Sequence, residues 1–164
     1  LNPKVNEQKT AYEFCKEKTS EQREYIYGDF NDGIIYDLAL ALDVFEHVED
    51  YYSFLRIFKN KAEYKVFHIP LDLSVQSVLR KSRILSDRYK VGHLHYFTKD
   101  LAIAVLKDLG YELIDYCYTS GSLELPASSF KNKLMRLPRK LMFFVNEDLA
   151  VRVLGGFSLL VVCK

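Results

Sequence analysis

The stretch YDLALALDVFEHVED at residues 36–50 decides the fold class of this chain. It begins as an apolar run and ends in a dense polar cluster. An apolar run of this kind predicts a strand buried on both faces, which is typical of parallel sheets in α/β proteins. Ligands of such sheets bind beyond the carboxyl ends of the strands. The strand is therefore expected to place Asp43, Glu46 and His47 at the rim where chemistry takes place.

The bulk composition indicates a globular protein with no obvious macromolecular partner. The chain has 164 residues, of which 49% are hydrophobic and 27% charged, and this length suits one domain. The net charge of +1 gives no case for nucleic-acid binding. Cys15, Cys117 and Cys163 form no CxxC pair, which favours a reducing cytoplasm over a disulfide framework. The longest apolar stretch, 153–163, is about half of the roughly 20 residues that a transmembrane helix needs.

Strand and helix patterns alternate along the chain, which predicts a mostly parallel α/β sheet. Besides the strand that opens at Tyr36, apolar runs predict strands, and helical periodicity predicts helices, in these ranges: strands 64–69, 111–118 and 156–163, and helices 50–61, 99–109 and 147–154. No repeat or low-complexity linker divides the chain. We therefore expect a single domain over residues 1–164, with insertions at about 71–97 and 119–146.

Four ordered segments make this pattern more specific. They are EYIYGDF at 24–30, DLALALDVFEHVED at 37–50, GHLHYFTKDL at 92–101 continuing to LGYE at 109–112, and LGGFSLLVV at 154–162. Together they resemble the small-molecule branch of the class I S-adenosylmethionine-dependent methyltransferases. In that family the second segment is the fourth strand with its D-V-(L/F)-E-H signature, and the first is the third strand with its terminal acid. The resemblance covers essentially the whole chain and implies a Rossmann-like, mostly parallel sheet with an antiparallel last strand.

The sequence departs from the family at its beginning. The family's first strands, its Gly-rich loop and the acid that holds the cofactor's ribose have no counterpart, and the acid would fall just before Leu1. We therefore expect an N-terminally incomplete methyltransferase domain whose third and fourth strands lack central partners. That arrangement would leave unpaired edges with apolar faces. On this interpretation the fragment alone is expected to be inactive.

The resemblance implies S-adenosyl-L-methionine as the cofactor and suggests which residues would bind it. Leu1 matches the apolar residue that packs on adenine. Asp29 matches the acid that accepts a hydrogen bond from the adenine amino group, and Phe30 matches the residue whose backbone N–H meets the ring. Asp43 and Phe45 match positions that line the methionine end. The alternative for Asp29 is that it merely belongs to a turn.

Candidate catalytic and acceptor-binding residues follow the two polar segments. His47 is the best candidate for a general base, because the pKa of imidazole suits proton transfer near neutral pH. The alternative is that Glu46 and His47 cap a helix or bond to backbone, with alignment of the substrates supplying most of the acceleration. His93, His95 and Tyr96 fall where the family builds part of its acceptor pocket, although structural hydrogen bonding is an alternative. We expect no metal site from the His-x-His pair, because no third ligand is in register.

The segment 130–141 combines basic residues with an apolar stripe formed by Phe130, Leu134, Leu137 and Leu141. It could form a lid over an anionic substrate or a weak basic amphipathic patch for membrane surfaces. The alternative is an insertion with one solvated face whose apolar stripe packs on the sheet.

The favoured function is S-adenosylmethionine-dependent methyl transfer to the O, N or C atom of a small or medium-sized acceptor, as part of a longer chain. A non-catalytic or degenerate binding domain of the same fold is the alternative. A dehydrogenase-like nucleotide-binding enzyme is a third hypothesis, but the predicted antiparallel last strand and the D-V-F-E-H signature argue against it.

Overall fold

The computed structural model describes residues 12–26, 33–120 and 130–164, and the chain divides into two compact units, Leu1–Ile34 and Ile35–Lys164. In the first unit, residues 12–16 are helical and an isolated antiparallel bridge joins Ser20 to Arg23. Residues 24–26 form no strand, so the prediction of a strand at 24–30 is wrong for its described part. A strand needs a neighbouring strand to satisfy its backbone groups. The bridge described here joins Ser20 to Arg23 and does not include residues 24–26.

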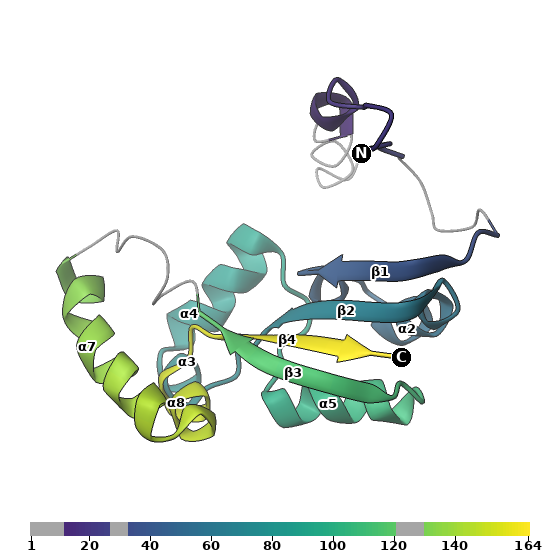
Figure 1. Ribbon diagram of the computed structural model, residues 1–164. Helices are drawn as coiled ribbons and strands as arrows, with labels where there is room; N and C mark the ends of the chain where they lie inside the picture. Colours follow the sequence, from purple (N-terminus) through teal and green to yellow (C-terminus); the bar gives the residue numbers. More distant parts are fainter. Residues whose placement is uncertain (1–11, 27–32, 121–129) are drawn as a thin grey trace. The chain divides into compact units, whose positions relative to one another are not determined.

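The second unit is built on a four-stranded sheet with the order β1-β2-β4-β3 (Figure 1). β1 (Tyr36–Leu42) pairs parallel with β2 (Ala62–Pro70), and β4 (Ser158–Cys163) pairs antiparallel with both β2 and β3 (Leu113–Thr119). The carboxyl ends of β1, β2 and β3 therefore share one edge of the sheet. The mixed α/β sheet and its antiparallel last strand confirm the predicted fold class.

Four described helices of this unit, α2, α3, α5 and α8, begin at a residue whose side chain caps the first turn. The Thr98 hydroxyl accepts from the Leu101 amide at the start of α5, and the Asn146 side chain accepts from Leu149 at the start of α8. At the other end of α5 the chain turns through Gly110 in a left-handed conformation (φ 76°). The helical elements are a 3₁₀ turn (Phe45–His47), α2 (Tyr51–Lys59), α3 (Val75–Leu79), α4 (Lys81–Ser86), a π-helical turn (Asp87–Val91), α5 (Lys99–Asp108), α7 (Phe130–Val145) and α8 (Glu147–Leu154).

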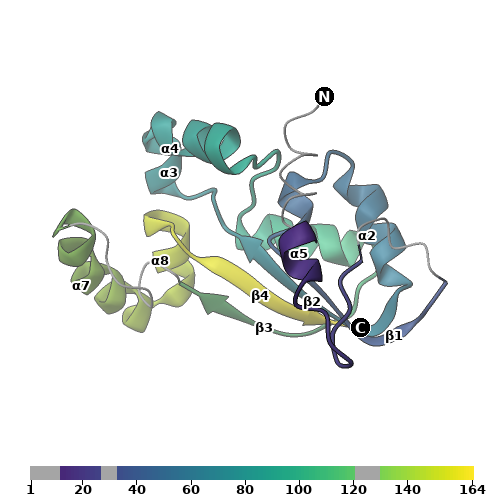
Figure 2. The same ribbon diagram turned by 90° about the horizontal axis from the view of Figure 1, so that it is seen from above.

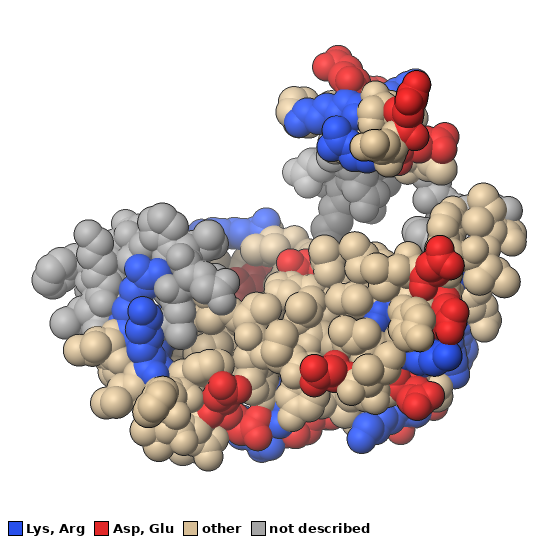
Figure 3. Space-filling model, in the orientation of Figure 1, with Lys and Arg blue, Asp and Glu red and all other residues tan. Residues whose placement is uncertain are grey.

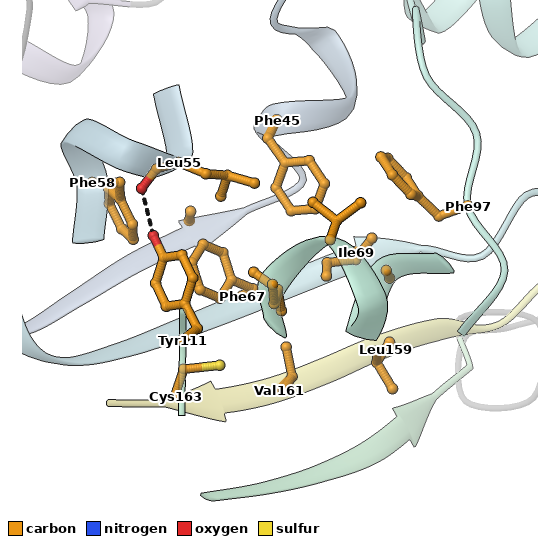
Figure 4. Packing of buried hydrophobic residues seen from close by; sticks show 14 of the residues in the cluster. Phe45, Leu55, Phe58, Phe67, Ile69, Phe97, Tyr111, Leu159, Val161 and Cys163 are labelled. Carbon is orange, nitrogen blue, oxygen red and sulfur yellow. Dashed lines mark hydrogen bonds between the residues drawn. The ribbon is translucent and has the colours of Figure 1, made fainter. Parts of the chain in front are cut away.

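One face of the sheet packs against α2 and α5 to form the core (Figure 4). Phe67 of β2 and Leu159 of β4 are fully buried there. The hydroxyl of Tyr111 lies in the same cluster and donates to the Leu55 carbonyl of α2 at 2.7 Å, which satisfies its polar end. This layer fixes the strands whose carboxyl ends form the rim.

Among the described residues of Ile35–Lys164, nothing covers the opposite face of β1. Ala39 and Ala41 are buried against the core, but Leu38, Leu40 and Leu42 are 52%, 56% and 51% exposed. The prediction of a strand buried on both faces is therefore wrong. β1 lies at the edge of the sheet, and within the described part of Ile35–Lys164 the helices α2 and α5 lie on the other side of the strands (Figures 1 and 2). Figure 3 accordingly shows a broad uncharged surface over the strands.

The basic segment forms α7, which contains Pro138. Leu137 and Leu141 are 76% and 65% exposed, so the expectation that this apolar stripe packs on the sheet is wrong for these two residues. The helix contacts the core through Phe143 instead, whose ring stacks on Phe157 at 5.2 Å. Among the described helices, none is both long and apolar enough to cross a bilayer.

Candidate functional site

A chain of hydrogen bonds connects the carboxyl ends of β1, β2 and β3. Nδ1 of His68 bonds to Oδ1 of Asp43 at 2.7 Å, and Nε2 of His68 bonds to Oγ1 of Thr119 at 2.8 Å. Asp43 has a φ of 52° and is the one described non-glycine residue with a positive φ. Aspartate tolerates this left-handed conformation better than most residues, and such backbone outliers often occur at functional sites. Asp43 is thus held at the rim with its side chain 53% exposed.

The side chain of Phe45 points away from the rim and into the core. Its ring is 1% exposed and packs against Tyr51 at 6.0 Å and Phe97 at 5.2 Å. The whole residue is buried, main chain included, so it presents almost no surface to a ligand at the rim.

Glu46 is a buried carboxylate in an unusual setting. Its side chain is 1% exposed, and within the described part of the chain neither carboxylate oxygen has a hydrogen-bond partner. Burial raises the pKa of Glu46 to about 7, and the charges of Asp43 and Asp72 act in the same direction. The Glu46 main-chain carbonyl accepts from the amides of Leu94 at 2.8 Å and His95 at 3.1 Å. These two bonds fix the loop before α5 against the 3₁₀ turn.

His47 and His93 lie beside this carboxylate and are oriented through their Nδ1 atoms. Nδ1 of His47 lies 3.1 Å from the carbonyl oxygen of Gly92, which can only accept, so Nδ1 carries the proton. Nε2 of His47 faces Oε1 of Glu46 at 3.7 Å. Nδ1 of His93 bonds to Oδ2 of Asp72 at 2.6 Å, and the two imidazole rings meet edge to face at 4.8 Å.

His95 and Tyr96 belong to a different set of contacts. Nε2 of His95 donates to the carbonyl of Val48 at 2.9 Å, and its ring lies against Tyr51 at 4.5 Å. The hydroxyl of Tyr96 donates to the carbonyl of His93 at 3.1 Å. These bonds hold the loop together, which is the structural alternative considered for the two residues. The structure thus separates His93 from the other two predicted acceptor contacts.

The candidate site therefore has two parts. The first is the rim chain of Asp43, His68 and Thr119. The second is the Glu46–His47–His93 cluster, whose potential ligand atoms all lie within 4.8 Å of one another. Such a cluster can hold a proton or a cation, because it combines a buried carboxylate with two imidazoles.

Sequence reasoning missed Asp72 and His68. Asp72 follows β2 closely, so it could have been found by applying to residues 64–72 the rule that places ligands beyond strand ends. The predicted adenine contacts Leu1, Asp29 and Phe30 lie outside the described residues.

Several solved structures share the fold. A SAM-dependent methyltransferase from Archaeoglobus fulgidus is 16% identical, covering 93% of this chain and 79% of that one, with a TM-score of 0.51. Magnesium protoporphyrin IX methyltransferase (ChlM) from Synechocystis PCC 6803, with bound SAH, is 14% identical over 94% of this chain and 57% of that one, with a TM-score of 0.53. The [4+2]-cyclase SpnF is 12% identical over 94% of this chain and 60% of that one, with a TM-score of 0.54.

These likenesses in structure have no counterpart in sequence. No protein-family model matches the chain, and no curated protein matches it in sequence. The chain spans little more than half the length of ChlM and SpnF. Because a cyclase occurs among the neighbours, the fold by itself does not name a reaction. What the likenesses show is that this chain has the fold of the class I S-adenosylmethionine-dependent methyltransferases.

Proposed function

We propose that the protein catalyses S-adenosylmethionine-dependent methyl transfer to a small or medium-sized acceptor, as part of a longer chain. One observation carries the proposal. The sheet order brings the carboxyl ends of β1 and β2 to one edge, and polar side chains gather there on a methyltransferase fold. In open α/β sheets this edge is where ligands bind. We also propose a cytoplasmic location, which suits the three free cysteines.

The described residues fit the methionine end of the cofactor. When bound, S-adenosylmethionine supplies a methyl group on a positively charged sulfonium. The carboxylate of Asp43 is half exposed and held in place by His68, so it can bind the ammonium group at the methionine end of the molecule. Phe45, which is buried, would support this end of the site through its packing in the core. Asp29, with Leu1 and Phe30, remains our proposed contact for the adenine.

We assign the Glu46–His47–His93 cluster to the acceptor side of the site. Glu46 and His47 follow the same strand end as Asp43, and the His47 side chain is 33% exposed. Nε2 of His47, the predicted base, is directed at Glu46. We therefore propose that His47 acts together with its buried neighbours and not as an isolated base. Alignment of the acceptor and exclusion of water supply the main acceleration.

The test is calorimetric titration of the full-length protein with S-adenosylhomocysteine. Asp43→Ala should weaken binding by roughly 10-fold or more, because a hydrogen bond to a charged group contributes about 1.5–3 kcal/mol. Asp29→Ala should weaken it as well. Asp37→Ala is the matched control, since it removes a carboxylate from the other end of β1. Absence of binding at millimolar ligand would contradict the proposal and favour a non-catalytic binding domain.

A further inference from the structure

We infer that Glu46, His47 and His93 form a binding site for a divalent transition-metal ion. One potential ligand atom from each residue lies within 4.8 Å of the other two. Glu46 and His47 come from the 3₁₀ turn that follows β1, and His93 comes from the loop that precedes α5. Two backbone bonds from that loop to the Glu46 carbonyl hold the two segments together. The cluster thus joins parts of the chain that are far apart in sequence.

The two imidazoles are oriented as metal ligands usually are. A histidine that binds a metal through one nitrogen commonly donates its other N–H to a carboxylate or a backbone carbonyl. His93 makes the first kind of bond with Asp72, at 2.6 Å, and His47 makes the second with Gly92, at 3.1 Å. Both bonds use Nδ1. Nε2 of each ring is therefore the atom available to a cation.

The carboxylate gives an independent reason to place a cation here. Glu46 is fully buried, and no described residue gives either of its oxygens a hydrogen bond. A buried carboxylate without a partner is costly, so buried charges in proteins are normally paired or coordinate a metal. Among the described groups, the nearby imidazole of His47 stops at 3.7 Å from Oε1, beyond hydrogen-bond distance. A divalent ion between the three side chains would be bound by one carboxylate oxygen of Glu46 and by both Nε2 atoms.

The donor set narrows the choice of ion. Two imidazoles and one carboxylate are a common set for catalytic zinc, with a fourth position left for water or substrate, and they also suit other transition metals. Bonds of about 2.0–2.1 Å in a tetrahedral site place ligand atoms roughly 3.4 Å apart. Because the ligand atoms lie within 4.8 Å of one another, the widest pair must close by up to about 1.4 Å. The partly exposed His47 side chain can make that adjustment and leaves an approach from solvent.

This site differs from the His-x-His pair considered from the sequence. His95 is not part of it: the described ligand atoms that lie together belong to Glu46, His47 and His93, and the His95 ring lies against Tyr51 instead. Metal binding does not depend on the proposed methyl transfer. If the proposed function holds, an acceptor oxygen bound at the open position would be polarised and held near the rim.

The experiment is a titration of the chelator-treated protein with Zn²⁺ by calorimetry, and with Co²⁺ by visible absorption. The native protein should bind one equivalent of Zn²⁺, give the spectrum of low-coordinate Co²⁺, and show a Tm that rises with added Zn²⁺. Asp72→Asn should weaken binding by roughly 10–100-fold, the usual effect of losing an outer partner of a metal-bound histidine. Glu46→Gln and His93→Ala should weaken it by more than that.

Two controls keep the result interpretable. Glu46→Gln preserves side-chain volume and removes only a buried charge, so its Tm without metal should not fall, and a lost metal response cannot be ascribed to unfolding. His95→Ala removes a neighbouring imidazole outside the cluster and should keep the native Zn²⁺ affinity. The inference is overturned if the native protein binds no Zn²⁺, or if Glu46→Gln and His93→Ala bind it as tightly as the native protein. Titration with S-adenosylhomocysteine, run separately, tests the proposed function by itself.

Discussion

The cysteines of β3 and β4 should differ sharply in reactivity. Cys163 is fully buried, and burial raises its pKa to about 11, while Cys117 is exposed. Because the thiolate is the reactive form, Cys163 should react roughly a hundredfold more slowly with a disulfide reagent at pH 8 than an ordinary thiol with a pKa near 8.5. A kinetic thiol assay checks this: Cys117→Ser should remove a fast phase, and Cys163 should appear only in denaturant. A native fast phase that is lost in Cys163→Ser instead would contradict the described β4.

At the same scale, the sequence located some site residues well and missed others for a physical reason. Asp43, Glu46 and His47 could be predicted because a polar cluster directly follows an apolar strand, and chain order alone brings it to the rim. The pairing of His93 with Asp72, and of His68 with Thr119, depends on how loops and strands return in space. No local spacing encodes such pairs. The direction of the Phe45 ring was likewise settled by core packing.

At the scale of elements, α5, α8 and β3 are tied together by one carboxylate. Oδ1 of Asp148 accepts from Nζ of Lys99 at 2.6 Å and from the hydroxyl of Tyr118. These two bonds lower the pKa of Asp148 below its ordinary value of 3.8. A lowered folded-state pKa stabilises the fold above the unfolded-state value, and this contribution is lost as pH falls through the folded-state pKa.

Asp148→Asn should therefore reduce the free energy of unfolding at pH 7 by about 0.2–1 kcal/mol, the range for an exposed ion pair. The difference from the native protein should shrink as the pH is lowered below 3.8. Urea unfolding at a series of pH values measures it. Glu49→Gln, which removes another exposed carboxylate outside this set of contacts, is the control variant. If the Asp148→Asn difference stays constant down to pH 2, the hydrogen bonds do not depend on the charge.

Among the elements, those with local signals were predicted best. Helical periodicity predicted α5, which the structure caps at Thr98 and follows with Gly110, and the bounds of α8 agree with the prediction. Burial was predicted less well, because an apolar run shows that a strand favours burial and does not show whether a second layer is present. β1 and α7 are the two elements where this distinction changed the outcome.

At the scale of the whole molecule, the two faces of the sheet should respond differently to the same substitution. Leu159→Ala on β4 truncates a fully buried side chain in the core and should lower the free energy of unfolding by about 2–5 kcal/mol. Leu40→Ala on β1 truncates a side chain that is 56% exposed on the opposite face and should change it by no more than about 0.5 kcal/mol. Urea denaturation of both variants gives the comparison, with an unchanged m-value indicating that the unfolding transition itself is the same. If Leu40→Ala costs as much as Leu159→Ala, the face formed by Leu38, Leu40 and Leu42 is covered in the native protein. An apolar strand surface of this kind would then be part of a second packed layer, as the sequence of β1 alone suggests.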